Sequence, residues 1–358
     1  MKITDIRVSI LGTQTLDKPH WNSIIYTTKH TYARVEIYTD EGIVGMAPAS
    51  SGSRHAIEGP IRSKLLGKNP LRTEELWQLM YMGGTRKPVA KGSFIEAMSV
   101  VDIALWDLKG KAFGQPVWRL TGGAQERVPA YAAGGYYEEG KGIRELCQEM
   151  ENYIAMGFHA VKMKIGGPGV TLREDAERVR AVRNAIGRDI ELMIDANNAW
   201  NAATAIRFGR MVENIEPYWF EEPVQPDDFE GAAKVAAALD IPVASGENEY
   251  TRWGFRDLIE RSGVEIVQAD PNKCGGISEW LKIAALASAH HLTMAPHGNP
   301  QVGSCCVAAV SNGFIVEIYP TAHNNPFMTM PDFRDGYIYM SEEPGLGIFW
   351  NEELISKG

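Results

Sequence analysis

The chain has 358 residues, of which 44% are hydrophobic and 23% are charged, and its net charge is −9. These proportions are typical of a folded globular protein, and the length fits a barrel with a smaller domain attached. An acidic chain without a basic stripe is not expected to bind nucleic acid. The sequence contains neither an 18-residue apolar run nor the apolar core of a signal peptide, so we expect no membrane partner and a cytoplasmic location.

The first part of the chain, residues 1–125, predicts an α+β domain. Residues 3–11 are typical of a strand, and alternating apolar residues at 31–49 predict a hairpin around a Thr-Asp-Glu-Gly turn. Residues 12–30, between these strands, are expected to be a loop, either merely exposed or acting as a lid over a site. Helical patterns follow at 55–68, 71–82 and 93–113.

From about residue 126 the pattern changes to short apolar strands that alternate with helical stretches. Eight parallel strands with intervening helices close into a barrel, which we predict over residues 126–320, followed by a segment, 321–358, that packs back on the first domain. A doubly wound open sheet is the weaker alternative, because its glycine fingerprint is missing. The predicted strands are 128–135, 160–166, 191–197, 218–223, 242–248, 265–273, 292–298 and 315–320.

Three acidic residues, Asp195, Glu221 and Glu247, recur at an interval of 26 residues, each at the end of a predicted strand. Carboxylates that converge at one end of a barrel repel one another strongly unless a cation neutralises them. Oxygen ligands suit Mg²⁺, and we predict one such ion per subunit. Each acid alone could be a helix cap or a surface charge. Strand alternation leaves the choice between Glu221 and Glu222 open, while the interval favours Glu221.

Two lysines, Lys162 and Lys164, alternate along the second barrel strand and therefore share one face. We expect both ammonium groups in the barrel mouth, opposite the carboxylates; the alternative is a solvated edge strand. A partly desolvated lysine beside a metal and another cation has a lowered pKa. Such a lysine could accept a proton from a substrate.

Asp270 and His297 end neighbouring strands, so a hydrogen bond between them is expected. A carboxylate beside an imidazole fixes its tautomer and raises its basicity, although a purely structural histidine is the alternative. Glu317 ends the eighth strand on the same side of the barrel. Candidate substrate contacts come from this barrel end and from the 12–30 loop: Asn197, Tyr136, His20 and Trp21.

Together these motifs resemble the mandelate racemase subgroup of the enolase superfamily. The resemblance covers essentially the whole chain. It rests on the segment VDIALWDLKGKAFGQPVWRLTGG (101–123), on the Lys-x-Lys, Asp-x-Asn, Glu-Glu-Pro and Gly-Glu-Asn strand ends, and on Asp270, His297 and Glu317. It implies a modified (β/α)₇β barrel capped by an α+β domain, a bound Mg²⁺ and removal of the proton α to a carboxylate.

The resemblance also implies a role for each residue. Lys164 is the implied base on one face of the substrate, and Lys162 is the implied cation that polarises the substrate carboxylate. His297, oriented by Asp270, acts on the other face, and Glu317 donates a hydrogen bond to the carboxylate. The implied Mg²⁺ ligands are Asp195, Glu221 and Glu247.

The expected chemistry needs charge stabilisation as well as a base. Enzymes typically lower the activation free energy by about 8–23 kcal/mol, and a positioned base supplies roughly 3–5 kcal/mol of this. Mg²⁺ and Lys162 must therefore supply much of the rest. A substrate with a β-hydroxyl would lose it with help from His297, which dehydrates an acid sugar to a 2-keto-3-deoxy acid.

We therefore expect a magnesium-dependent lyase that acts on a small carboxylate. Without a leaving group, His297 would return a proton instead, so a racemase or epimerase of a 2-hydroxy acid is the alternative. A non-catalytic metal-binding scaffold is a remote one. The resemblance further implies a homo-oligomer, either a dimer or an octamer.

Overall fold

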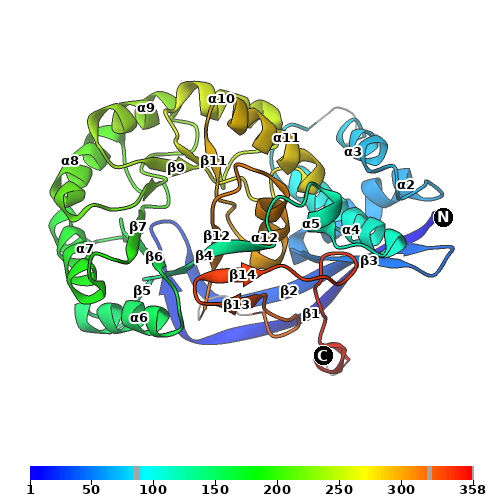
Figure 1. The fold of residues 1–358 in the computed structure, drawn as a ribbon, viewed down its shortest axis with the longest axis horizontal. Helices are drawn as coiled ribbons and strands as arrows, with labels where there is room; N and C mark the ends of the chain where they lie inside the picture. The colour runs from blue at the N-terminus through cyan, green and yellow to red at the C-terminus, as the bar shows by residue number, and fades with distance from the viewer. Residues whose placement is uncertain (84–88, 321–324, 357–358) are drawn as a thin grey trace.

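The computed structural model describes residues 1–83, 89–320 and 325–356, and it consists of a barrel with a smaller α+β domain beside it (Figure 1). The smaller domain has an antiparallel sheet in the order β3-β2-β1-β5. Its strands are β1 (Ile3–Trp21), β2 (Tyr26–Thr39) and β3 (Val44–Ala49), joined at one edge by β5 (Tyr137–Glu138).

The helices of the smaller domain pack on this sheet, chiefly through the long helix α4 (Ser93–Phe113), which is predicted with its bounds correct. It ends at Gly114, whose left-handed backbone (φ 62°) suits a residue without a Cβ. The stretch predicted as a helix at 55–68 has a π-turn around Pro60, which lacks a backbone N–H. The other elements are η1 (Ser51–Ser53), α1 (Arg54–Ala56), η2 (Ile57–Ile61), α2 (Arg62–Leu65), α3 (Thr73–Tyr81) and α5 (Val117–Leu120).

The barrel contains all eight predicted strands, in shorter form. They are β4 (Arg127–Gly134), β6 (Ala160–Lys164), β7 (Glu191–Asp195), β8 (Phe220–Glu221), β9 (Val243–Ser245), β10 (Ile266–Val267), β11 (Thr293–Met294) and β12 (Val316–Ile318). Parallel pairing runs from β4 to β11, β12 pairs with β4, and a bridge between Met294 and Gly313 closes the ring. The predicted fold, a modified barrel with an α+β cap, is confirmed.

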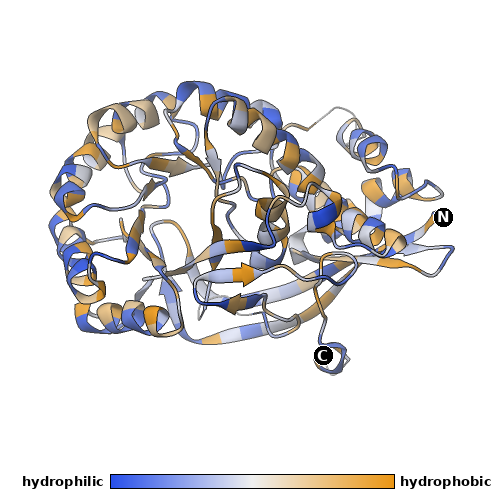
Figure 2. Ribbon diagram, viewed as in Figure 1, coloured by the Kyte–Doolittle hydropathy of each residue, from blue (hydrophilic) through white to orange (hydrophobic). Residues whose placement is uncertain are grey.

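A helix follows each of the first seven barrel strands and lies on the outside of the ring (Figure 1). These helices are α6 (Ile143–Ala155), α7 (Leu172–Ile186), α8 (Ala202–Val212) with η3 (Glu213–Ile215), α9 (Phe229–Ala238), α10 (Thr251–Arg261), α11 (Gly276–Ala289) and α12 (Pro300–Ala309). Hydrophobic colours dominate the barrel strands in Figure 2, because both faces of a parallel sheet are buried. Inside the ring, Tyr131, Met193 and Trp219 form a buried layer beneath the charged strand ends.

The expectation of a loop at residues 12–30 is wrong, because this segment extends β1 and β2 into a long ribbon. Only residues 22–25 form the turn, where Asn22 accepts hydrogen bonds from two backbone N–H groups. The ribbon is fastened to the barrel: Trp21 pairs with Tyr137, and the Ser23 hydroxyl donates to the Asn197 carbonyl oxygen at 2.6 Å. Its tip therefore lies over the barrel end that carries the charged residues.

The C-terminal segment contacts both parts of the molecule. Its hairpin, β13 (Asp332–Arg334) and β14 (Tyr337–Tyr339), adds to the barrel sheet through β4, which the sequence did not predict. The final helix α13 (Glu352–Ile355) meets the smaller domain, where Arg34 binds Glu352 at 2.5 Å. In the part of the chain that the structure describes, no helix is long and apolar enough to cross a membrane.

Candidate active site

A row of charged side chains lies across neighbouring strand ends. Strand register places Lys164 beside Asp195 and Asp195 beside Glu221, so the three belong to one edge of the barrel. The Lys164 ammonium group binds the Asp195 carboxylate, and both are buried. Lys162 Nζ lies 2.5 Å from Glu221 Oε1 and 2.7 Å from Glu317 Oε1. Both lysines thus face the barrel interior, as their alternation predicted.

These ion pairs decide the protonation of the lysines. Burial alone would lower the pKa of Lys164, but the charge of Asp195 outweighs it and raises that pKa above its ordinary value. The expected lowering of the pKa supposes a metal ion beside Lys164, so this ion pair alone does not test it. Burial likewise opposes ionisation of Asp195, yet Lys164 and Lys162 together hold its pKa below the ordinary range. The positive charge of Lys164 is therefore favoured as long as no other cation neutralises Asp195.

The implied role of Glu317 as a hydrogen-bond donor requires a protonated carboxyl group. Burial favours its neutral form, but Lys162 and His297 hold its pKa far below the ordinary value. A carboxylate only accepts hydrogen bonds, so Glu317 cannot be the donor to a substrate in this protonation state. It accepts instead, from the backbone N–H of Gly298 at 3.2 Å and from the Tyr319 hydroxyl at 2.7 Å.

The two adjacent glutamates occupy different surroundings. Glu221 faces the barrel interior, where Trp219 Nε1 (2.9 Å) and Gln268 Nε2 (2.6 Å) donate to its Oε2. Glu222 has a left-handed backbone (φ 42°), which ends the strand and turns its side chain toward Asn248 (2.8 Å). Burial and the nearby charge of Glu247 raise the pKa of Glu222 well above its ordinary value.

The three predicted metal ligands do not gather around one point. Over residues 1–83, 89–320 and 325–356, no three acidic, histidine or cysteine side chains are arranged to hold an ion, because Asp195 and Glu221 turn toward lysine ammonium groups. The donor chemistry nevertheless fits a hard cation, since all the groups present oxygen. Buried oxygens without a hydrogen-bond partner lie at these strand ends: Glu247 Oε2, Glu222 Oε2 and Asn197 Oδ1.

On the opposite side of the barrel mouth, His297 and Asp270 lie within hydrogen-bonding distance, as expected for neighbouring strands. His297 Nδ1 is 3.0 Å from Asp270 Oδ2. Its Nε2 faces Glu247 Oε2 at 3.4 Å and the Tyr319 hydroxyl at 3.3 Å. Burial would lower the pKa of His297, but Glu247, the bond to Asp270 and Glu317 together raise that pKa to about 10. His297 is therefore held as a cation, able to donate a proton.

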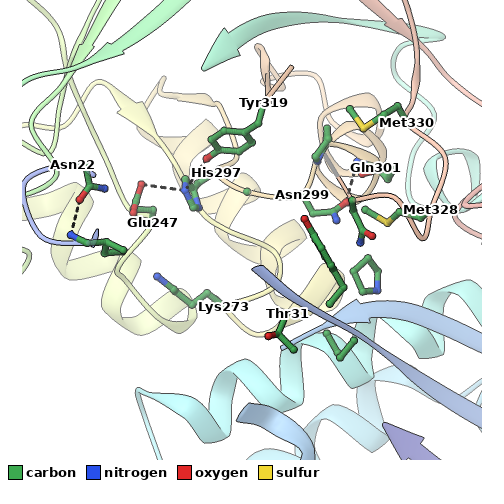
Figure 3. A pocket seen from close by; sticks show the side chains of 18 of the residues that line it. Asn22, Thr31, Glu247, Lys273, His297, Asn299, Gln301, Tyr319, Met328 and Met330 are labelled. Atoms are coloured by element: carbon green, nitrogen blue, oxygen red, sulfur yellow. Dashed lines mark hydrogen bonds and ion pairs between the residues drawn. The ribbon is translucent and has the colours of Figure 1, made fainter. Parts of the chain in front are cut away.

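A cavity of about 460 Å³ lies between the ribbon and the barrel mouth, and Lys164 and His297 both line it. Figure 3 shows Glu247, His297 and Tyr319 on one side of this cavity, and Met328 and Met330 on the other. The ribbon contributes Asn22, Ile25, Thr31 and Tyr32 to its wall. The two acid/base groups therefore line the same cavity, and the smaller domain forms part of its wall.

Of the four predicted substrate contacts, Asn197 and Tyr136 line the cavity, and His20 and Trp21 do not. His20 packs beneath the wall, with its ring 4.6 Å from that of Tyr136. Trp21 stacks on two tyrosines that fasten the ribbon, Tyr26 and Tyr137. Both side chains pack between the ribbon and the barrel, so the cavity lining gives no support to their expected role as substrate contacts.

Several lining residues were not predicted. Tyr319 lies two positions after Glu317, so strand alternation could have found it. Lys273 ends a predicted strand, and its ammonium group donates to Asn248 at 3.2 Å. Met328 and Met330 come from the C-terminal segment, whose sequence gave no indication that it returns to the barrel mouth.

Comparison with known proteins places this geometry among related chains. Residues 5–122 match the family "Mandelate racemase / muconate lactonizing enzyme, N-terminal domain", and residues 145–354 match "Enolase C-terminal domain-like". The chain is 35% identical to arabinonate dehydratase of Saccharolobus solfataricus (87% of this chain, 86% of the relative) and 33% identical to D-galactarolactone cycloisomerase of Agrobacterium fabrum (100% and 98%). A magnesium-bound racemase from Streptomyces coelicolor superposes with a TM-score of 0.91 at 28% identity, covering 99% of both chains.

Proposed function

Because this chain belongs to the mandelate racemase/muconate lactonizing enzyme family of the enolase superfamily and is an enzyme of the lyase or isomerase type, we propose that it is a magnesium-dependent acid-sugar dehydratase. The observation that carries this proposal is the pair of acid/base groups that line one cavity. Lys164 ends β6, and His297, held by Asp270, follows β11, which is three strands away around the ring; both side chains line this cavity. Removing a proton from one face and protonating a leaving group on the other requires such a pair.

The proton α to a carboxylate is weakly acidic, so the negative charge that develops must be stabilised. Lys162 is buried and keeps its charge, because Glu221 and Glu317 raise its pKa despite the opposing effect of burial. A fixed buried cation of this kind stabilises developing negative charge without reorganising. Lys162 thus stabilises the substrate that has lost its α-proton, and this effect does not depend on the chain length of the substrate.

Asp195, Glu221 and Glu247 would hold the Mg²⁺ ion, with the Asp195 and Glu221 carboxylates released from the lysines. When bound, the ion supplies positive charge for the substrate carboxylate and for the enediolate formed from it. With Asp195 neutralised in this way, the pKa of Lys164 falls, because the charge that raises it is cancelled. The neutral Nζ of Lys164 then accepts the α-proton of the substrate.

The group that His297 protonates determines which product forms. His297 carries a proton, and its Nε2 is the ring nitrogen that faces the cavity side of the dyad. It protonates a departing β-hydroxyl group, and the resulting enol becomes a 2-keto-3-deoxy acid. Isomerisation is the second candidate, favoured by the cycloisomerase relative that matches the full chain. In that reaction His297 returns its proton to the substrate carbon instead.

A cytoplasmic location and a homo-oligomeric state complete the proposal. The four cysteines, Cys147, Cys274, Cys305 and Cys306, are free thiols, which supports a reducing compartment such as the cytoplasm. A homo-oligomeric state, as a dimer or an octamer, is also part of the proposal and is measured by light scattering of the purified protein.

The proposal is tested by incubating the protein with a panel of mono- and dicarboxylic sugar acids and Mg²⁺ in D₂O. We expect a 2-keto-3-deoxy product from at least one acid, with EDTA abolishing the reaction. Deuterium incorporation at the α carbon without loss of water would favour the isomerase. If no acid exchanges its α-proton or forms a keto product, the proposed function is wrong.

A further inference from the structure

Tyr319 lines the cavity next to His297 but has no part in the mechanism proposed above. Tyr319 follows β12 and lies on the same strand face as Glu317, two positions earlier. Its hydroxyl donates to Glu317 Oε2 at 2.7 Å and lies 3.3 Å from His297 Nε2. In Figure 3 the phenol is directed toward His297, and both side chains belong to the cavity wall.

The geometry of this hydroxyl determines what it can bind. A phenol has one proton to donate and also accepts hydrogen bonds. Because Glu317 accepts the phenol proton, the Tyr319 oxygen can act toward other groups only as an acceptor, and His297 Nε2 lies 3.3 Å from it. Glu317 does not depend on this bond for its position, because Lys162 Nζ and the Gly298 N–H also contact its carboxylate.

We propose that Tyr319 contacts the substrate: its hydroxyl oxygen accepts a hydrogen bond from the β-hydroxyl group and holds that group beside His297 Nε2. This inference rests on the proposed function and deepens it. The group that leaves in a dehydration must lie next to the acid that protonates it, at about hydrogen-bonding distance. The Tyr319 oxygen lies beside His297 Nε2, as Glu247 Oε2 also does, and it can accept a hydrogen bond from a hydroxyl group.

The variant Tyr319→Phe removes the hydroxyl and keeps the ring. Its rate of α-proton exchange in D₂O is measured with two acids, one accepted by the native protein and the same acid without its β-hydroxyl group. We expect a fall of about 10- to 100-fold with the β-hydroxy acid, the size of a lost hydrogen bond to an active group, and little change with the deoxy acid. Tyr339→Phe, on β14 where its hydroxyl bonds Arg127 at 3.4 Å, is the matched control and should behave like the native protein.

Two results overturn the inference. An equal fall with both acids means that Tyr319 merely braces the site, and no fall with either means that it contacts nothing that matters. Thermal unfolding checks that Tyr319→Phe is folded; if it is not, Tyr319→His, which keeps a ring and a polar atom, is measured with the same two acids. Failure of the proposed function is distinguishable, since the native protein would then exchange neither acid, and both proposals would fall.

Discussion

The contact between α4 of the smaller domain and α11 of the barrel contains a buried acid, Asp102, whose removal gives a quantitative test. Its two carboxylate oxygens accept from the Ser278 N–H at 2.8 Å and the Ser278 hydroxyl at 2.7 Å. Burial, only partly offset by these bonds, raises the pKa of Asp102 to about 7 from 3.8. A folded-state pKa above the unfolded value means that the native protein binds the proton more tightly. Its stability therefore falls as the pH rises from about 4 to about 7.

The shift of about 3 pH units corresponds to about 4 kcal/mol at 1.36 kcal/mol per unit. With an unfolding entropy of about 2.1 cal/mol/K per residue, this is a change in Tm of about 5 °C for a chain of this length. Asp102→Asn cannot ionise and keeps one acceptor for Ser278. We expect its Tm to be close to the native value at pH 4.5 and about 5 °C above it at pH 8.

Differential scanning calorimetry at the two pH values provides the measurement, and Asp332→Asn, an exposed residue on β13, is the control. Comparing native and variant proteins at each pH cancels the other titrating groups. The reasoning is refuted if the Tm difference between native protein and Asp102→Asn is the same at pH 4.5 and pH 8. That result would mean that Asp102 does not carry its proton in the native state.

Three further predictions concern the site. Lys164→Arg keeps a cation beside Asp195 but cannot become neutral, so α-proton exchange should fall about 10²–10⁴-fold with Tm little changed; an unimpaired exchange rate would remove Lys164 as the base. Asp270→Asn removes the charge that orients His297, and the dehydration rate should fall about 10- to 100-fold, whereas equal activity would show that His297 needs no partner. Asp195→Asn should weaken Mg²⁺ binding measured by calorimetry, and an unaltered affinity would exclude Asp195 as a ligand.

Much of the barrel could be predicted from the sequence because each strand carries its own signal. Short apolar runs separated by helical stretches are local features, and eight of them leave few arrangements other than a ring. The interval between Asp195 and Glu221 equals one strand and one helix, so their equivalent positions follow from the repeat. Lys162 and Lys164 share a face for an equally local reason, the two-residue period of a strand.

The errors come from features that depend on contacts between distant residues. Residues 12–30 form a ribbon because Trp21 pairs with Tyr137 and Ser23 binds the Asn197 carbonyl group, and neither partner is visible in the segment itself. Spacing alone also leaves the protonation of Lys164 open, because its pKa depends on whether Asp195 is paired with it or with another cation. Met328 reaches the cavity only because the C-terminal segment returns over the barrel.

We propose above all that Asp195, Glu221 and Glu247 form a site for a divalent cation, although Asp195 and Glu221 are paired with lysines in this structure. The most direct test is an anomalous difference map from crystals grown with Mn²⁺, which binds the same oxygen ligands as Mg²⁺. We expect one peak at the barrel mouth, in contact with oxygens of Asp195, Glu221 and Glu247. The Lys164 ammonium group should then no longer bind Asp195. A map with no peak there, and with both lysine–carboxylate pairs intact, would contradict this proposal.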